Sequence, residues 1–477
     1  MTQVDAGALV RRTHHVLRPD ATRVVSSPFL PGEEISGAGI SRRSAVLGRL
    51  LALPDAEVDA ALIEVLTSFS TRHHDLPALL DARFALVAPH VADSGALSLE
   101  RRRLIGACMS QEYAIESAAL FNPSMVAHPD QGGLPAGSTR FVMSVRGVGE
   151  GHVSCVELRT GVVDASDEIT FDTPGPTTTV PGRLETRHSR DDLRRQNEEL
   201  GGDPGDADAL LRTLPATFGA EALEGSPRLE WLAACTYGVA FPEASAMDSR
   251  VLLPGSPAER HGVEDLRLVE VEPDGARRSY LGTYTAFDGE SVAPHLVATE
   301  DFTTFRMSRL TGPGAKNKGM ALFPRRVGGQ YLALSRWDRE SNSLAASSDL
   351  RHWDDLGTLR APARAWEIVQ AGNCGSPVET SAGWLVLTHG VGPMRRYSIG
   401  ALLLDLDDPR RVLGSLAAPL LTPEADERDG YVPNVVYSCG GLVHGDTLVL
   451  PYGCSDSSIR LALVDLPQLA ARILAGS

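Results

Sequence analysis

The feature that most constrains the fold is a repeat of short β-rich segments from Phe121 onward. In each unit an apolar run precedes a polar residue, and a second run ends near Asp-Leu, as in LALSRW…SLAASSDL and LVLPYGC…LALVDL. The aligned polar residues lie 139, 51, 53 and 64 residues apart, at Arg146, Thr285, Arg336, His389 and Gly453. Five units of about fifty residues predict a mainly β chain folded as a five-bladed β-propeller. A β-sandwich with accidental similarity between strands is the alternative.

The long first interval contains a polar, helix-forming stretch with a GGDPGD break, which predicts a helical insertion over about 186–235. Before the repeats, residues 41–120 carry apolar residues three and four apart, with Asp, Ser and Pro at the breaks. A chain of 477 residues also exceeds the roughly 100–200 residues of one ordinary domain. We therefore expect a helical N-terminal region over 1–118 and a propeller catalytic domain over 119–477.

The chain is acidic, with 61 Asp and Glu residues against 45 Lys and Arg residues and a formal net charge of −16. A surface of this sign repels phosphate backbones and anionic lipid heads, so neither nucleic acid nor a membrane is an expected partner. The chain has no run of about 18 apolar residues, and its first twenty residues lack the apolar core of a secretory signal. These features predict a cytoplasmic protein.

The six cysteines stand without CxxC pairs and without histidines at ligand spacing. Neither a metal site nor a disulfide framework is therefore expected. We interpret these cysteines as buried residues, because a free cysteine packs as a small hydrophobe.

Charged and aromatic residues gather at matching ends of the repeats. In GVEDLRLVEV, Glu264 and Asp265 open a strand just before Arg267. A carboxylate beside an arginine is usually a structural ion pair, which is the alternative interpretation of this segment. The following units add candidates at turns and strand ends: Lys318, Arg336, His389, Tyr397 and Asp456. Residues of these types from separate blades would line one pocket suited to binding a polyhydroxylated ligand and to acid catalysis.

The order and the residues of these segments resemble those of glycoside hydrolase family 130, the β-mannoside phosphorylases and β-1,2-mannosidases. The resemblance runs from about Phe121 to the C-terminus, apart from the insertion, and is strongest from Glu264 to Leu466. It is carried by four segments together: GWLVLTHGV, LLDLDDP, YVPNVVYSCG and YGCSD. Members of this family are five-bladed propellers, which agrees with the repeat count. The N-terminal helices lie outside the shared part.

The resemblance implies a role for each matching residue. Asp265 resembles the family's general acid, which in the phosphorylases protonates the glycosidic oxygen by way of a sugar hydroxyl. Asn122 and Arg146 resemble the residues that hold mannose in the −1 subsite, and Asp456 resembles an acidic residue of the last blade that binds sugar hydroxyls. The positions that match the phosphate-binding residues of the phosphorylases are Lys318, Arg336, His389 and Tyr397.

One departure from the family pattern favours hydrolysis. In the phosphorylases a basic residue that helps to neutralise phosphate stands nineteen positions before the His of the HGV motif, where this chain has Gln370. Losing one cation from a phosphate site removes a charge-assisted hydrogen bond of roughly 1.5–3 kcal/mol. We therefore expect water rather than phosphate to be the attacking group.

Hydrolysis with inversion requires a second carboxylate to deprotonate the water, typically about 6.5–9.5 Å from the acid. The candidate bases are Glu150 in RGVGEGH and Glu379 in GSPVETSAGW, and a solvated or salt-bridged surface glutamate is the alternative for each. His152 could orient a carboxylate or bind a hydroxyl, although a lone histidine in a β segment is more often structural.

The expected function is an inverting glycoside hydrolase that releases mannose from β-mannosides, with β-1,2-linked manno-oligosaccharides as the expected partners and substrates. The enzyme alternative is a β-mannoside phosphorylase that releases mannose 1-phosphate, with inorganic phosphate as co-substrate. A third alternative, from a different class, is a propeller that binds sugar without chemistry. No metal or other cofactor is expected. The N-terminal helices could cap the channel, restrict it to short substrates, or form a homo-oligomer contact.

Overall fold

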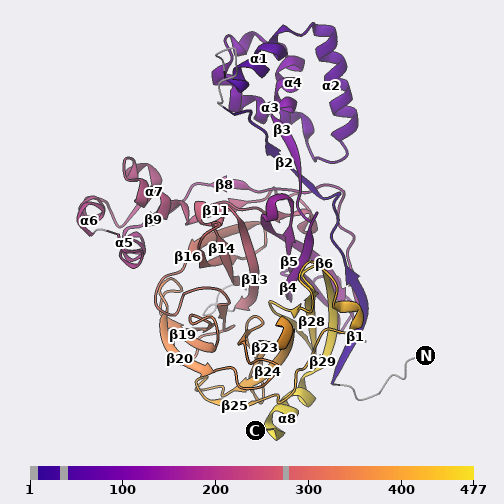
Figure 1. The fold of residues 1–477 in the computed structure, drawn as a ribbon, viewed down its shortest axis with the longest axis vertical. Coiled ribbons are helices and arrows are strands. Elements are labelled where there is room, and N and C mark those ends of the chain that lie inside the picture. Colours follow the sequence, from indigo (N-terminus) through magenta and orange to yellow (C-terminus); the bar gives the residue numbers. More distant parts are fainter. Residues whose placement is uncertain (1–8, 33–40, 203, 272–278, 477) are drawn as a thin grey trace. The chain divides into compact units, whose positions relative to one another are not determined.

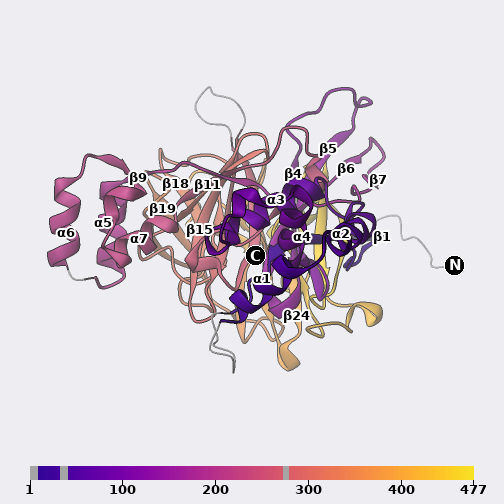
Figure 2. The same ribbon diagram turned by 90° about the horizontal axis from the view of Figure 1, so that it is seen from above.

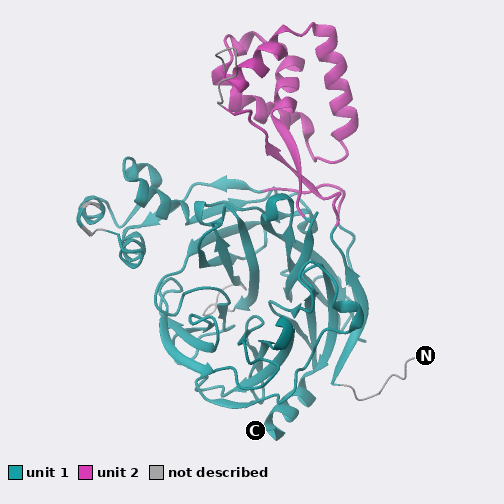
Figure 3. Ribbon diagram, in the orientation of Figure 1, with its two compact units in different colours: residues 1–19, 116–174, 181–477 teal, residues 20–115, 175–180 magenta. Residues whose placement is uncertain are grey.

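The computed structural model describes residues 9–32, 41–202, 204–271 and 279–476. It divides into two compact units (Figure 3). Unit 1 comprises residues 1–19, 116–174 and 181–477, and unit 2 comprises residues 20–115 and 175–180. Parts of the expected N-terminal region, at 1–8 and 33–40, and residue 203 of the expected insertion lie outside the described residues. No described helix is both long enough and apolar enough to cross a membrane.

Unit 2 is helical, with one two-stranded sheet. Its helices are α1 (Arg42–Ala52), α2 (Asp55–Phe69), α3 (Leu76–Val87), η1 (Ala88–His90), η2 (Ser94–Ala96) and α4 (Leu99–Cys108). Strand β2 (Val24–Pro28) pairs antiparallel with β3 (Ser110–Ala114). The Ser41, Asp75 and Ser98 side chains accept hydrogen bonds from backbone N–H groups in the first turns of α1, α3 and α4, as N-caps do.

Unit 1 is mainly β, as the repeats predict. Its largest sheet has eleven strands in two antiparallel sets, which one parallel pairing joins at Gly262 and Ser154. The first set is β4 (Ala119–Ala127), β5 (Thr139–Val148), β6 (Ser154–Val163), β7 (Ile169–Phe171) and β12 (Val251–Leu252). The second set is β13 (Gly262–Val271), β14 (Ser279–Phe287), β15 (Val292–Thr299), β16 (Thr304–Arg309), β11 (Tyr237–Ala240) and β8 (Gly182–Leu184).

Three further sheets follow along the chain and lie around a common centre with the first (Figure 1). One is β17 (Ala321–Leu322), β18 (Tyr331–Ser335), β19 (Asn342–Ser347) and β20 (Asp354–Arg360). The next is β21 (Gln370–Asn373), β22 (Val378–Thr380), β23 (Gly383–Val391), β24 (Tyr397–Leu404) and β25 (Val412–Ser415). The last is β26 (Val436–Tyr437), β27 (Leu442–His444), β28 (Thr447–Cys454), β29 (Ser458–Asp465) and β1 (Val10–Leu17).

Strand β1 corrects the expectation of a helical region over all of 1–118. Residues 10–17 belong to unit 1 and pair antiparallel with β29, close to the other end of the chain. The segment VRRTHHVL is too polar to show an apolar run, so its strand character depends on the partner strand rather than on its own pattern.

The expected insertion contains three short helices with a small sheet. These elements are β9 (Arg187–Ser189), α5 (Arg190–Glu199), α6 (Pro204–Thr213), β10 (Thr217–Gly219), η4 (Ala220–Leu223) and α7 (Pro227–Ala234). Figure 2 shows α5, α6 and α7 grouped beside the strands of unit 1. The remaining short helices are η3 (Glu150–His152), η5 (Met247–Ser249), η6 (Pro257–Glu259), η7 (Pro393–Arg395), η8 (Ala425–Glu427) and the C-terminal α8 (Leu466–Ala475).

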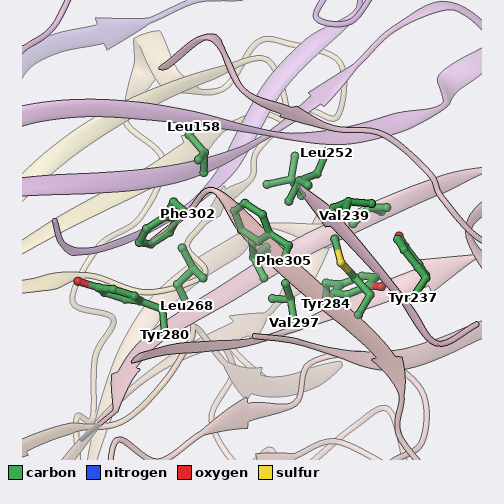
Figure 4. Packing of buried hydrophobic residues seen from close by; sticks show 14 of the residues in the cluster. Leu158, Tyr237, Val239, Leu252, Leu268, Tyr280, Tyr284, Val297, Phe302 and Phe305 are labelled. Atoms are coloured by element: carbon green, nitrogen blue, oxygen red, sulfur yellow. The ribbon is translucent and has the colours of Figure 1, made fainter. Parts of the chain in front are cut away.

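Apolar side chains fill the space between neighbouring strand sets. The cluster in Figure 4 joins residues of β6, β13 and β14 to residues of β11 and β15, with Phe302 and Phe305 at its centre. Five of the six cysteines are buried and all six are unpaired. The aligned polar residues of the repeats lie in or just after the second strand of each set, since Arg146 is on β5, Thr285 on β14, Arg336 after β18, His389 on β23 and Gly453 on β28.

Candidate active site

A cavity of about 210 Å³ opens where the sheets of unit 1 converge. It is lined by residues from every sheet that surrounds the centre: Phe121, Asn122, Arg146, Asp265, Lys318, Arg336, Gln370, His389, Arg395, Tyr397, Val432, Val435, Tyr437 and Asp456. A larger cavity of about 590 Å³ lies beside β13, β17 and β18, and its described lining residues include no carboxylate. The smaller cavity is the one that brings together the residues singled out from the sequence.

Three polar residues of the cavity wall have a left-handed backbone. Asn122 and Asp265 have φ values of 49° and 56°, and Asp456 has a φ of 49°. The registers of β4 with β5 and of β13 with β14 shift beside the first two residues, as at a β-bulge. A bulge rotates a side chain out of the alternation of its strand, and non-glycine residues in this conformation concentrate at functional sites. The bulges therefore turn Asn122 and Asp265 toward the cavity.

The Asp265 carboxylate is held by two donors on one oxygen. Asn122 Nδ2 donates to Oδ1 at 2.7 Å, and Arg146 Nη1 donates to the same oxygen at 3.1 Å. No described residue donates to Oδ2. Burial raises the pKa of the Asp265 carboxyl, but the nearby cations, Arg146 foremost, and the Asn122 amide lower it by more. The carboxyl pKa is therefore below its usual value when the cavity holds no ligand.

Glu264, the neighbour of Asp265, fixes two of these cations. Its Oε1 accepts from Arg146 Nη2 at 2.7 Å, and its Oε2 accepts from the Lys318 ammonium. Glu264 is buried, and removing one partner of a buried ion pair leaves an uncompensated charge at a cost of roughly 3–5 kcal/mol. Glu264 thus sets the positions of Arg146 and Lys318 at once.

A second buried cation lies beneath the cavity. Arg267 donates from Nη1 to Asn373 Oδ1 at 2.6 Å and from Nη2 to the Tyr437 hydroxyl at 2.6 Å. Burial lowers the pKa of the guanidinium, but the Tyr437 hydroxyl and other surrounding groups raise it by more, so Arg267 stays charged. Its positive charge adds to the field that an anion in the cavity would meet.

His389 positions Arg336. Burial and the charges of Arg336 and Arg267 hold the pKa of the His389 imidazole well below its usual value, so the ring is neutral. Its Nδ1 lies 3.1 Å from the Asn373 carbonyl oxygen, and its Nε2 lies 2.9 Å from Arg336 Nη1. In the tautomer that fits both contacts, Nδ1 donates to the carbonyl and Nε2 accepts from the guanidinium. Arg336 Nε is buried and has no hydrogen-bond partner among the described residues.

The pKa of the Asp456 carboxyl is shifted in the opposite direction to that of Asp265. Burial, followed by the charge of Asp265, raises the pKa of the Asp456 carboxyl to about 6. Two carboxyl groups whose environments push their pKa values apart are typical of sites that both donate protons and bind hydroxyl groups. The cavity thus holds an ionised Asp265 and an Asp456 that is partly protonated near neutral pH.

Eight of the sequence-predicted site residues line this one cavity: Asn122, Arg146, Asp265, Lys318, Arg336, His389, Tyr397 and Asp456. Three do not. His152 lies in η3, and its Nδ1 is 3.0 Å from the hydroxyl of Tyr431, next to the lining residue Val432. Glu150 is exposed in the same turn and is not part of the lining.

Glu379 is also absent from this cavity. It is on β22, where its carboxylate forms a bidentate pair with Arg325, and it lines a different cavity beside Val269 and Glu270. The step along β13 from Asp265 to Glu270 spans about 16 Å, at about 3.3 Å per residue. The expectation that Glu150 or Glu379 is a base opposite Asp265 is therefore not supported by their positions. Nearness to a strand end in sequence does not reveal at which end of the sheet a side chain lies.

Four residues that the sequence reasoning gave no role belong to the site: Arg267, Asn373, Arg395 and Tyr437. Arg395 had a usable signal, since it follows the HGV motif in the turn GPMRRY and is basic. It lies in η7 with a φ of 54°, after Met394 with a φ of 58°. Tyr437 also had a signal, since it lies in the segment YVPNVVYSCG, whereas Asn373 had none and contacts the buried guanidinium of Arg267.

The substitution Asp456→Asn tests the raised pKa. Between pH 4 and 6 the folded protein keeps the Asp456 proton that the unfolded chain releases, so stability falls as pH rises through this window. The cost, about 1–3 kcal/mol at roughly 1.4 kcal/mol per pKa unit, is complete above pH 6. Asn tolerates the left-handed backbone. We expect Asp456→Asn to be more stable than the wild type at pH 7.5 and similar to it at pH 4, by denaturant unfolding. An equal stability difference at both pH values would contradict the pKa assignment.

Known proteins share this part of the chain. Residues 232–471 match the family model described as beta-1,4-mannooligosaccharide phosphorylase. A 1,2-beta-oligomannan phosphorylase of Thermoanaerobacter sp. (strain X514) is 31% identical over 233 residues, which cover 47% of this chain and 75% of that protein. A beta-1,2-mannobiose phosphorylase of Listeria innocua is 34% identical over 219 residues, which cover 44% of this chain and 59% of that protein.

Among solved structures, the beta-1,2-mannobiose phosphorylase of Listeria innocua in complex with beta-1,2-mannobiose matches with a TM-score of 0.45 and 24% identity, over 76% of this chain and 93% of that one. The family model spans half of the chain, and the sequence matches cover the strands that carry Asp265, Arg336 and His389. The resemblance of the motifs is therefore confirmed: the chain belongs to glycoside hydrolase family 130, the family of the β-mannoside phosphorylases.

Proposed function

We propose that the protein is a β-mannoside phosphorylase, which transfers a mannosyl group from a β-mannoside to inorganic phosphate and releases mannose 1-phosphate. The observation that carries this proposal is the unpartnered Nε of Arg336, a buried cationic donor in the wall of the cavity beside Lys318. A buried donor without a partner costs roughly 1–3 kcal/mol, and a bound anion removes that cost.

Arg395 supplies a cation to the cavity in place of the one that is missing at Gln370. Gln370 lies in the cavity with its Nε2 3.5 Å from the Tyr397 hydroxyl. Arg395 lines the same cavity from the turn between β23 and β24, two positions before Tyr397. A cation from this turn can take the part that a basic residue at 370 would play.

Hydrolysis would require Asp456 to act as the base, because Asp265 is the acid. Among the described residues the carboxylates of the lining are Asp265 and Asp456, and the nearby Glu264 is already engaged by Arg146 and Lys318. A phosphate oxygen needs no base, because it is already an anion at neutral pH. The relatives named above are phosphorylases, which supports the same choice.

The proposed reaction is a displacement at C1 of the mannose ring. A phosphate oxygen forms the new bond to C1 while the bond from C1 to the glycosidic oxygen breaks, and the leaving oxygen takes a proton that originates from Asp265 by way of a sugar hydroxyl. Binding of phosphate beside Lys318 and Arg336 offsets the charges that lower the pKa of Asp265. Phosphate thereby prepares the acid that its own attack requires.

The substrate in this proposal is a short β-mannoside, with a β-1,2 linkage as the first choice because two relatives act on β-1,2-linked compounds by name. The cavity of about 210 Å³ is below the range of about 300–1,000 Å³ that is usual for larger ligands. Such a volume suits one sugar ring with phosphate beside it.

The proposal includes a five-bladed propeller. The eleven-stranded sheet consists of two antiparallel sets joined by one parallel pairing, so these sets count as two blades. Three further sheets bring the count to five, and β1 closes the ring through β29. This count agrees with the five sequence repeats.

Phosphate dependence tests the proposed reaction. With β-1,2-mannobiose and phosphate we expect mannose 1-phosphate and mannose in equal amounts, and without phosphate we expect the rate to fall at least about 100-fold. Products are measured by anion-exchange chromatography. Release of two mannose molecules per mannobiose at an equal rate without phosphate would establish hydrolysis instead.

Substitution Arg395→Gln tests the phosphate-binding role of that residue. Loss of one charge-assisted contact of roughly 1.5–3 kcal/mol should raise the KM for phosphate about 10- to 100-fold. In the double variant Gln370→Lys/Arg395→Gln, a cation returns from the neighbouring wall and the KM for phosphate should fall again. Arg410→Gln is the matched control, because Arg410 pairs with Asp408 on the surface. An unchanged KM for phosphate in Arg395→Gln would remove Arg395 from the site.

Substitution Asp265→Asn separates an enzyme from a sugar-binding propeller. General acid catalysis contributes about 10²–10⁴-fold, so kcat should fall by that factor. Binding of mannobiose, followed by calorimetry, should persist within about tenfold, since the amide keeps the size of the side chain. Wild-type turnover in this variant would exclude Asp265 as the acid, and a wild-type protein that binds mannobiose without turnover would establish the non-catalytic class.

A further inference from the structure

The first and last strand sets of unit 1 meet along a seam that also contains two adjacent histidines. The closing seam, as we name it, is the contact between the set β4–β7 and the sheet formed by β1, β29, β28, β27 and β26. Its core is one apolar cluster that combines Phe141, Val163 and Ile169 from the first set with Ile459 and Leu461 from the last sheet.

Polar bonds cross the closing seam at several points, and two of them lie at the turn between β6 and β7. The Thr447 hydroxyl donates to Asp167 Oδ2 at 2.9 Å, and His444 Nε2 is 2.9 Å from the Asp164 carbonyl oxygen. Both contacts tie the turn between β6 and β7 to β27 and β28. The outermost strand of the last sheet, β1, is joined to this region by a hydrogen bond between the His15 ring and the backbone of Ile169, the first residue of β7.

A bulge in β1 places His14 and His15 on the same side of the strand. Arg12 pairs with Ala462 and Val16 pairs with Arg460, so three residues of β1 stand opposite Leu461 alone. In a regular strand consecutive side chains point to opposite faces. Here the two imidazole rings lie 4.1 Å apart, and the His15 ring lies 5.7 Å from the ring of Phe171 on β7.

Glu168 supplies a carboxylate at the same point. It ends the turn between β6 and β7, and its backbone N–H donates to Asp164 Oδ1 at 3.0 Å, which fixes the turn. One donor atom from each of His14, His15 and Glu168 lies within 4.8 Å of the others. Among the described residues no hydrogen bond joins these three side chains to one another, and the hydrogen bond of the His15 ring to the backbone of Ile169 leaves the other nitrogen of that ring for a ligand.

We propose that His14, His15 and Glu168 bind a Zn²⁺ ion that clasps β1 to the turn between β6 and β7 and so holds the closing seam. Two imidazoles and one carboxylate are a common donor set for zinc, with water in the fourth position. A tetrahedral ion with bonds of about 2.0–2.1 Å needs its ligand atoms about 3.3 Å apart. The donor atoms lie within 4.8 Å of one another, so binding requires the side chains of the exposed His14 and Glu168 and the half-buried His15 to rotate toward a common point.

The ion joins two strand sets that are distant in sequence, and a bound ligand of the folded state stabilises it by mass action. The clasp is independent of the proposed reaction, because none of its residues lines the catalytic cavity.

Calorimetric titration of untagged protein with ZnCl₂ tests the clasp. All proteins carry Cys108→Ser, which removes the one exposed thiol. We expect one bound Zn²⁺, and binding at least about tenfold weaker in His14→Gln and in Glu168→Gln, which remove a ligand from either side of the seam. His74→Gln, which changes an exposed histidine of unit 2, is the control and should bind as the parent does. Mg²⁺ should not bind, because it takes oxygen rather than imidazole ligands.

Hydrogen exchange separates a clasp from adventitious surface binding. With Zn²⁺ bound, the amides of β1 should exchange at least about fivefold more slowly, and this protection should be lost in both ligand variants while their thermal midpoints in EDTA match that of the parent. Equal Zn²⁺ affinity in parent and variants would overturn the site. Binding that requires both residues but leaves the exchange of β1 unchanged would overturn the clasp.

Discussion

The site depends on one arrangement of charge, in which two consecutive carboxylates on β13 bind a cation of the first strand set, Arg146, and a cation from the segment between β16 and β17, Lys318. Glu264 binds Arg146 and Lys318, while Asp265 shares Arg146 and accepts from Asn122. Charges removed from water are stable only when they are paired and hydrogen-bonded. The buried charges of the first set and of β13 are therefore tolerated only where these elements meet, so their packing is coupled to assembly of the site.

This arrangement also explains why backbone strain appears where it does. Asn122 and Asp265 lie at bulges with left-handed backbone, on the first strands of the first two sets. A regular strand would send Glu264 and Asp265 to opposite faces, and only one of them could meet Arg146. The bulge directs both carboxylates to the same guanidinium, and the hydrogen bonds that result offset a strain of roughly 1–3 kcal/mol.

Much of this architecture can be predicted from the sequence. For each part that cannot be predicted, there is a physical reason. The apolar runs repeat, so the strand sets and the position of Arg146, Arg336 and His389 on them are predictable from spacing. Strand β1 is not, because its polar sequence becomes a strand only beside β29. Family motifs located Asp265 and Asp456, whereas Glu150 and Glu379 were chosen by sequence proximity and lie outside the cavity. The position of the Arg395 side chain in the cavity depends on the backbone conformation of the turn between β23 and β24, which the pattern of apolar residues in the strands does not determine.

The pairing of β1 with β29 has a consequence for how the chain is made. Thr13 is bonded to Leu461, so 448 residues separate the two sides of this contact. At about 5–20 residues per second, roughly 20–90 s of synthesis pass between them. During that time β1 is a strand without its neighbour, the kind of edge that invites aggregation. Its arginines and histidines protect β1 during this interval, because charged and polar side chains on an edge strand disfavour pairing with strands of other chains.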